Sequence, residues 1–244
     1  MIRIAFFDTK PYDRQAFETQ LAENPSAKGI KASFFEPRLD RTTASMAKGH
    51  DAVCIFVNDV ADKDTIDVLV ALGVKLIALR CAGYNNVDFK YAHGRIALCR
   101  VPAYSPYAVA EHAMAMLLCL NRNLHHAYVR VREFNFTLTG LTGFDLHGKT
   151  AGIVGMGKIG RAFASICQGF GMDVVAYDAY PSPMDGVKFL SLGEVLSKAD
   201  VLSLHCPLTK DTHHMINKKT ISSMKKGAVL INTSRGGLVD SIAL

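Results

Sequence analysis

Short apolar runs alternate with longer amphipathic segments along the first part of the chain. The apolar runs have the length of buried strands, and the segments between them place apolar residues at helical spacing. The predicted strands are residues 2–7, 31–35, 52–57, 76–79 and 97–101, and the predicted helices are residues 12–24, 43–48 and 62–72. This alternation predicts a parallel sheet with helices on both faces.

The pattern changes after Pro102. A long helix is predicted for residues 106–135, because this segment opens with Tyr104-Ser-Pro106 and has no internal proline or glycine. A polar, glycine-rich connection at 137–149 then leads to a second alternating series, with strands predicted at 150–155, 173–178, 201–205 and 229–233. The sequence therefore predicts an α/β protein with two doubly wound parallel-sheet domains, residues 1–101 and 102–244.

Composition narrows the class of protein. The chain has 244 residues, of which 49% are hydrophobic and 20% charged, as in globular proteins. Its most apolar stretch, residues 109–120, contains Glu111 and His112 and is too short to span a membrane. The amino terminus reaches Asp8 after a short apolar run, unlike a secretory signal peptide. We therefore expect no membrane partner.

Charged and metal-ligating residues form no cluster that changes this interpretation. The net charge of +6 is spread along the chain in runs no longer than two, so nucleic acid is not an expected partner. The pairs His125-His126 and His213-His214 lack further ligands at metal-binding spacing, so no metal is expected. Six scattered cysteines without a CxxC pair indicate reduced thiols and a cytoplasmic location.

The strongest motif is a glycine-rich turn after the predicted strand at 150–155. Gly155, Gly157 and Gly160 form a Gly-x-Gly-x-x-Gly pattern that continues into a helix through Lys158 and Ile159. These glycines allow a tight turn, close approach of a pyrophosphate to the backbone, and close packing of helix on strand, and the helix N-terminus stabilises the anion. The sequence predicts a dinucleotide-binding Rossmann domain.

An acidic residue and two later strand ends complete the predicted cofactor site. Asp178 ends the next strand, where its carboxylate can accept hydrogen bonds from the adenosine ribose and repel a 2′-phosphate, so NAD is favoured over NADP. Residues beyond the carboxyl ends of strands surround ligands in such sheets. The other predicted cofactor-binding residues are Lys158, Ile159, His205, Cys206, Pro207, Thr212, Thr233 and Ser234.

Several motifs together resemble one enzyme family. They are Gly155-Met-Gly157-Lys-Ile-Gly160, His205-Cys-Pro-Leu-Thr209, Asn232-Thr-Ser-Arg235-Gly-Gly237-Leu-Val-Asp240, Ala78-Leu-Arg-Cys-Ala-Gly83-Tyr-Asn-Asn-Val-Asp88 and Val101-Pro-Ala-Tyr104-Ser-Pro-Tyr-Ala-Val-Ala-Glu111-His112. The chain is similar over its whole length to the D-2-hydroxyacid dehydrogenases, and most similar to those that act as bacterial fermentative D-lactate dehydrogenases.

The resemblance implies an oxidoreductase that transfers a hydride between NADH and pyruvate or a similar small 2-keto acid. Residues 1–101 would be a flavodoxin-like substrate-binding domain and residues 102–244 the Rossmann NAD-binding domain, through which a homo-oligomer would form. Arg235 would be the catalytic, substrate-binding arginine, because a guanidinium fork can hold a carboxylate and polarise the adjacent carbonyl. Ala82 and Gly83 would bind the carboxylate through backbone donors, and Tyr104 would line the pocket.

The family also uses a histidine and a carboxylate that follow the Ser-Arg-Gly segment by several dozen residues. The sequence stops at Leu244, at the opening of a predicted helix, so we expect it to lack both groups and to be shortened at its C-terminus. The resemblance also implies that the Rossmann domain is incomplete and lacks its last strands, which would leave the strand at 229–233 as an open sheet edge. General acid/base catalysis is typically worth about 10²- to 10⁴-fold, so we expect weak or no turnover. His205 could substitute in principle, but the resemblance gives its position no such role.

Two alternatives stay open at this point. The chain could be a non-catalytic NAD-binding or protein-interaction module derived from this family, which the missing histidine and carboxylate favour. It could also act on hydroxypyruvate, glycerate or a bulkier 2-keto acid, since Tyr104 and Val57-Asn58-Asp59 hint at the pocket shape without fixing it.

Overall fold

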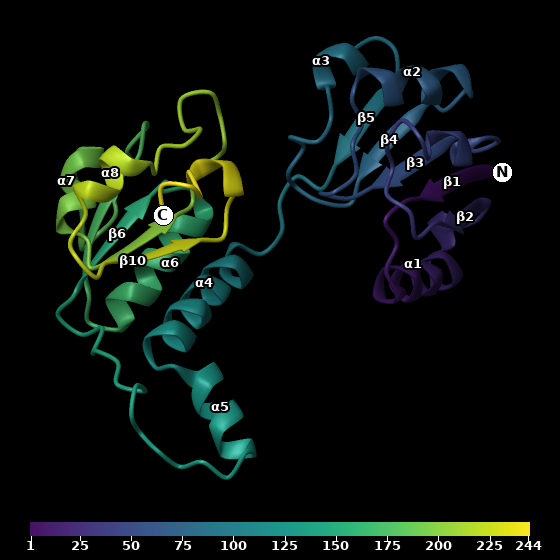
Figure 1. Cartoon of the computed structure of the whole chain (residues 1–244). Helices are drawn as coiled ribbons and strands as arrows, with labels where there is room; N and C mark the ends of the chain where they lie inside the picture. The colour runs from purple at the N-terminus through teal and green to yellow at the C-terminus, as the bar shows by residue number, and fades with distance from the viewer. The chain divides into compact units, whose positions relative to one another are not determined.

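The computed structural model describes residues 1–244 and consists of two compact α/β units (Figure 1). Unit 1 comprises Met1–Tyr104 and unit 2 comprises Ser105–Leu244. None of the helices is both long and apolar enough to cross a lipid bilayer. The division falls just beyond the predicted boundary at residue 101.

Unit 1 contains one five-stranded parallel sheet. Its strands are β1 (Ile2–Phe6), β2 (Ile30–Phe34), β3 (Ala52–Ile55), β4 (Leu76–Leu79) and β5 (Ala97–Arg100), and its helices are α1 (Pro11–Glu23), α2 (Lys63–Ala71) and α3 (Phe89–Ala92), with 3₁₀ turns η1 (Pro25–Ala27) and η2 (Ala44–Ala47). The strand order β2-β1-β3-β4-β5 is the flavodoxin-like order, as expected from the sequence.

The central strands of unit 1 are apolar because helices cover both of their faces. Every residue of β3 is buried, which explains why its sequence, Ala-Val-Cys-Ile, shows no alternation of polar and apolar residues. Phe7, Ile55, Ile66 and Ile77 are fully buried in the core of this unit. Asp62 caps α2 by accepting a hydrogen bond from the backbone N–H of Thr65 at 3.0 Å.

Unit 2 contains a second five-stranded parallel sheet. Its strands are β6 (Thr150–Val154), β7 (Asp173–Tyr177), β8 (Val187–Phe189), β9 (Val201–Leu204) and β10 (Val229–Asn232), and its helices are α4 (Pro106–Asn121), α5 (Leu124–Arg132), α6 (Lys158–Gly169), α7 (Leu192–Lys198) and α8 (Lys218–Ser222), with η3 at Gly236–Leu238. The strand order is β10-β9-β6-β7-β8. Counted from β6 as the first strand and read from the β8 edge, this is the Rossmann order 3-2-1-4-5.

This order places the predicted cofactor residues at one edge of the sheet. The chain leaves β6 toward β7 on one side and later returns to β9 on the other, so the switch point lies between β6 and β9. Both strands run parallel, with Val154 opposite Leu204 in register. The glycine-rich turn after β6 and the segment after β9 therefore meet. Fully buried Phe163 packs α6 beneath this region.

Two helices predicted from the sequence were wrong in detail, and two short elements were not predicted. The helix predicted over residues 106–135 is two helices, α4 and α5, separated where Asn123 adopts a φ of +49°. Asparagine tolerates this left-handed conformation better than most residues, so it can end one helix and begin another. The segment predicted as a helix at residues 43–48 is the short 3₁₀ turn η2, and β8 and α3 were not predicted.

Candidate functional site

The glycine-rich turn of unit 2 has two positions where only glycine fits. Gly155 has a φ of +95°, and a Cβ there would stand 2.6 Å from the backbone nitrogen of Cys206. A Cβ at Gly160 would stand 2.0 Å from the carbonyl oxygen of Gly155. A Cβ at Gly157 would meet nothing within 4 Å. The turn is thus closed toward the protein and open at the helix N-terminus, the position where a pyrophosphate approaches.

Asp178 lies directly after β7 and is fixed by two backbone donors. Its Oδ2 accepts from the N–H of Met156 at 2.6 Å, and its Oδ1 accepts from the N–H of Tyr180 at 2.8 Å. The side chain is half-buried beside the glycine-rich turn. Each carboxylate oxygen can accept a further hydrogen bond, so the group suits a pair of ribose hydroxyls.

His205 follows β9 and is held by its neighbours. Its Nε2 lies 3.0 Å from the Oγ of the fully buried Ser203, and its ring lies 5.2 Å from that of Phe163 on α6. Burial lowers the pKa of His205 from 6.5 to about 4, so the imidazole is neutral at pH 7. Its Nδ1 is buried without a hydrogen-bond partner.

The segment after β10 brings three predicted residues to the same sheet edge. Ser234 donates from Oγ to the carbonyl of Leu204 at 2.8 Å, which joins this segment to the end of β9. The hydroxyl of Thr233 is buried without a partner. Arg235 is half-buried and donates from Nη1 to the carbonyl of Ser234 at 2.9 Å. Arg235 therefore follows a residue that contacts the carboxyl end of β9, and His205 is the first residue after that strand.

Cys206, Pro207 and Thr212 form the start of the loop after β9. Cys206 is half-buried, its Sγ lies 3.6 Å from the Sδ of Met215, and burial raises the pKa of its thiol. Thr212 donates from Oγ1 to the carbonyl of Pro207 at 2.7 Å and accepts from the N–H of Thr209 at 2.8 Å. The hydroxyl of Thr212 thus closes this loop on itself.

In unit 1, the loop predicted to bind the substrate carboxylate follows β4. Arg100 donates from Nη1 to the carbonyl of Ala82 at 2.8 Å, and the Sγ of Cys81 donates to the carbonyl of Gly83 at 3.2 Å. The two carbonyls are therefore held by side chains. No hydrogen bond within the chain uses the backbone N–H of Ala82 or Gly83.

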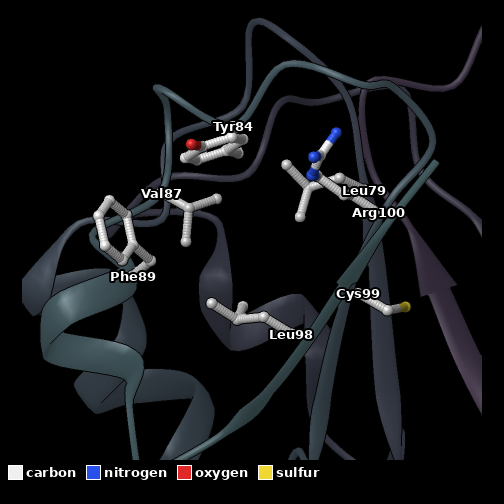
Figure 2. A pocket seen from close by; sticks show the side chains of 7 residues that line it. All are labelled: Leu79, Tyr84, Val87, Phe89, Leu98, Cys99 and Arg100. Carbon is white, nitrogen blue, oxygen red and sulfur yellow. The ribbon is translucent and has the colours of Figure 1, made fainter. Parts of the chain in front are cut away.

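An apolar pocket of about 320 Å³ lies beside this loop, lined by Leu79, Tyr84, Val87, Phe89, Leu98, Cys99 and Arg100 (Figure 2). The guanidinium of Arg100 lies 5.3 Å from the centre of the Tyr84 ring, and Tyr84 meets Phe89 edge-on at 5.9 Å. These contacts order the residues directly after Gly83. Arg100 was not predicted from the sequence, because an arginine at the end of a strand carries no local signal of a long-range contact.

The remaining predicted pocket residues differ in their surroundings. The side chain of Tyr104 is 59% exposed, so the packing of unit 1 does not fix it. Asp59 is fully buried and accepts a hydrogen bond from the N–H of Leu39 at 2.6 Å, which makes it part of the internal framework. Burial raises the pKa of Asp59 above its usual value. No group of three or more potential ligands gathers anywhere in the chain to hold a metal ion.

The edge of unit 2 fits a dinucleotide. The open backbone at Gly157 suits a pyrophosphate, and the carboxylate of Asp178 suits ribose hydroxyls. Two buried polar atoms, Nδ1 of His205 and Oγ1 of Thr233, lack partners within the chain, and polar groups of a bound molecule would satisfy them. These observations agree with the cofactor predicted from the sequence.

The chain is similar to known proteins over its whole length. Residues 114–244 match the family model described as "D-isomer specific 2-hydroxyacid dehydrogenase, NAD binding domain". The "2-hydroxyacid dehydrogenase homolog 1" of Schizosaccharomyces pombe is 52% identical over 248 residues, which cover 100% of this chain and 74% of the relative.

Two solved structures are also similar. The apo-structure of D-lactate dehydrogenase from Escherichia coli has a TM-score of 0.90 at 46% identity, over 99% of this chain and 77% of that chain. D-lactate dehydrogenase from Aquifex aeolicus, complexed with NAD and lactic acid, has a TM-score of 0.83 at 32% identity, over 98% of this chain and 71% of that one.

Proposed function

The chain belongs to the D-isomer-specific 2-hydroxyacid dehydrogenases, with NAD as cofactor, and from that premise we propose that its substrate pair is pyruvate and D-lactate. When bound, NADH supplies the hydride that the keto carbon accepts, and a proton must reach the keto oxygen. The residues of the chain have to bind the 2-keto acid, orient it and polarise its carbonyl.

The position of Arg235 carries this proposal. It follows β10 at the sheet edge that also holds His205 and Thr233, and Ser234 ties its segment to the end of β9. A guanidinium has a planar fork of N–H donors, which can hold a carboxylate and stabilise charge that develops on the neighbouring carbonyl oxygen. We assign substrate binding and polarisation of the carbonyl to Arg235.

We assign binding of the substrate carboxylate also to the loop of Ala82 and Gly83. Their carbonyls are engaged by side chains and their N–H groups have no acceptor in the chain, so the donors are available to an anion. Tyr104 is proposed as a further pocket residue, since its exposed phenol combines an apolar ring with a hydrogen-bonding tip.

We expect the 244-residue polypeptide to bind NADH but to reduce pyruvate slowly. His205 lies among the predicted cofactor residues after β9, but it is neutral at pH 7 and its Nε2 is already paired with Ser203. A neutral imidazole of such low pKa is a poor proton donor, and general acid catalysis is typically worth about 10²- to 10⁴-fold.

We also propose a homo-oligomer that forms through unit 2. Seven large apolar side chains on α5 and the segment after it are each more than half exposed: Leu124, Tyr128, Val129, Val131, Phe134, Phe136 and Leu138. So many exposed apolar side chains on one short segment are unusual on a monomer, and a second copy of the chain offers the same side chains in return.

The six free cysteines favour a reducing, cytoplasmic environment.

The proposed function is tested by two measurements on the 244-residue protein. NADH binding is followed by fluorescence, and NADH oxidation is followed with excess pyruvate. We expect clear NADH binding and slow oxidation that depends on pyruvate. The variant Arg235→Ala should keep NADH binding and lose the pyruvate-dependent oxidation.

Each outcome decides a different part of the proposal. Rapid turnover would contradict the assignment of His205 as a poor proton donor. Turnover with larger 2-keto acids but not with pyruvate would contradict the substrate assignment. Binding of NADH with no effect of pyruvate, even at high protein concentration, would favour the non-catalytic module.

A further inference from the structure

The loop that follows β7 is fastened to α6 at two places. Arg161 donates from Nη2 to the carbonyl of Ser182 at 2.6 Å and from Nη1 to the carbonyl of Pro183 at 3.2 Å. Two helical turns further along, Gln168 donates from Nε2 to the carbonyl of Asp185 at 2.8 Å. Residues seven apart lie on one face of a helix, so both side chains point toward the same loop.

The loop residues that Arg161 holds lie close in sequence to Asp178, the carboxylate of the proposed cofactor site. Tyr180, two residues before Ser182, donates its backbone N–H to Oδ1 of Asp178 at 2.8 Å. The other carboxylate oxygen is held by the N–H of Met156 in the glycine-rich turn. The orientation of Asp178 therefore depends on where the loop places the backbone of Tyr180.

The charge of Arg161 is directed at neutral acceptors. Two nitrogens of its guanidinium donate to backbone carbonyls, and no ion pair joins Arg161 to Asp178 within 4.0 Å. The negative charge of Asp178 is thus not neutralised by this arginine. A carboxylate in this state attracts hydroxyl donors and repels a phosphate.

We propose that Arg161 is a positioning residue for the adenosine half of the dinucleotide. By holding Ser182 and Pro183 on α6, it fixes the N–H of Tyr180 and, through it, the carboxylate of Asp178. This inference rests on the proposed role of Asp178 as the acceptor for ribose hydroxyls. It requires no contact between Arg161 and the dinucleotide.

The chemistry of arginine suits this task better than that of lysine. A guanidinium donates from two separate nitrogens in one plane, so it can hold two successive carbonyls at once. A lysine has one nitrogen at the end of a flexible chain, and it would keep the charge but lose the fixed pair of contacts. The variant Arg161→Lys therefore separates charge from geometry.

The test measures the two halves of the cofactor separately on the 244-residue protein. Affinity for ADP-ribose is measured by calorimetry, and affinity for reduced nicotinamide mononucleotide by fluorescence. We expect Arg161→Ala to weaken ADP-ribose binding about tenfold, on the scale of one hydrogen bond from a charged donor, and to leave the mononucleotide unchanged. Arg161→Lys should recover only part of the loss.

Gln168→Ala is the matched control, because it removes the second fastening from the same helix face and the same loop. We expect it to leave ADP-ribose binding close to that of the unaltered protein, since Asp185 is farther along the loop from Asp178. Thermal unfolding of each variant reports on folding. Equal loss of both half-cofactors in Arg161→Ala, or equal loss of ADP-ribose binding in Gln168→Ala, would overturn the inference.

A double-mutant cycle distinguishes this inference from the role of Asp178 itself. If Arg161 acts through Asp178, ADP-ribose should bind no more weakly to the double variant Arg161→Ala/Asp178→Ala than to Asp178→Ala alone. Additive losses would show that Arg161 acts independently, against the proposal. If Asp178→Ala alone has no effect, the ribose assignment fails. If Asp178→Ala weakens binding and Arg161→Ala does not, only the role of Arg161 fails.

Discussion

The carboxylate of Asp178 accepts a hydrogen bond from the backbone N–H of Met156 at 2.6 Å. This bond joins the end of β7 to the middle of the glycine-rich turn, so the groups proposed to bind ribose and pyrophosphate have a fixed separation. It also means that Asp178 does two things at once, because one carboxylate oxygen orders the turn while the group keeps capacity for further donors. Its replacement should therefore alter both affinity and selectivity.

We predict that Asp178→Ala weakens NADH binding about tenfold and narrows the preference for NADH over NADPH. The carboxylate accepts ribose hydroxyls and repels a 2′-phosphate, so its loss affects the two cofactors in opposite directions. Fluorescence titrations with both cofactors measure the ratio. Asp185→Ala, an exposed carboxylate of the same loop, is the control and should leave the ratio unchanged. An unaltered ratio in Asp178→Ala would refute the assignment.

We predict that Gly160→Ala destabilises unit 2 and abolishes tight NADH binding. The new Cβ would stand 2.0 Å from the carbonyl oxygen of Gly155, so α6 must shift away from the turn. We expect a loss of more than about 2 kcal/mol in the free energy of unfolding, as for other overpacked sites. Denaturant unfolding and NADH fluorescence would measure both effects.

The matched control for that change is Gly169→Ala at the other end of the same helix. A Cβ there meets nothing within 4 Å, and alanine is the better helix former by about 1 kcal/mol. We expect unaltered or slightly higher stability and normal NADH binding. Similar losses in both variants would mean that the helix, and not the contact between Gly160 and Gly155, is sensitive.

The buried imidazole of His205 predicts a specific dependence of stability on pH. Burial lowers its pKa to about 4, whereas in the unfolded chain the value is near 6.5. Between these values the unfolded state binds more protons, so stability is complete above pH 6.5 and is lost as the pH falls toward 4. The loss in the free energy of unfolding between pH 7 and pH 4 is on the order of 3 kcal/mol.

Denaturant unfolding at several pH values, compared between the unaltered protein and His205→Gln, measures this contribution. Glutamine keeps a polar group near Ser203 but does not titrate, so the difference in stability between the two proteins should shrink as the pH falls from 7 to 4. A difference that stays constant across this range would contradict the low pKa of His205.

Much of the fold follows from local sequence because the strands of a parallel sheet are continuous apolar runs. The strands predicted at residues 76–79 and 150–155 agree with β4 and β6 to within one residue. The predicted helix over residues 106–135 failed because its break depends on the conformation of Asn123, and a single asparagine is compatible with a helix interior. The short strand β8 has only three residues, Val187–Phe189, too few to show a pattern.

The residues of the candidate site could also be predicted only in part. The glycine-rich turn and Asp178 were predictable, because backbone geometry and the dinucleotide require those residue types at that spacing. Arg161 and Arg100 were not, since their partners are carbonyls 21 and 18 residues away in the chain, and any residue type offers a carbonyl. The low pKa of His205 also depends on packing that the sequence does not reveal.

The last prediction concerns the apolar surface of α5 and the segment after it. Phe134 is 85% exposed and Leu138 is 79% exposed, so each has little to lose in the folded monomer if it becomes polar. We predict that Phe134→Ser/Leu138→Ser shifts the protein from oligomer to monomer in analytical ultracentrifugation, with secondary structure retained by circular dichroism. Burial of each such side chain in an interface contributes about 1.5–3 kcal/mol. The loss of both contributions is enough to lower the association constant more than a hundredfold.

Tyr12→Ser in unit 1 is the matched control, since this residue is also an exposed aromatic side chain, at 65%, but lies outside the proposed surface. It should leave the sedimentation behaviour unaltered, whereas a monomer in this control would mean that any exposed aromatic residue contributes to association. If the unaltered protein is already monomeric at micromolar concentration, the surface on α5 does not form the proposed interface. If Phe134→Ser/Leu138→Ser keeps the oligomer intact, association proceeds through another face. Two polar side chains buried within the proposed interface would necessarily weaken the association.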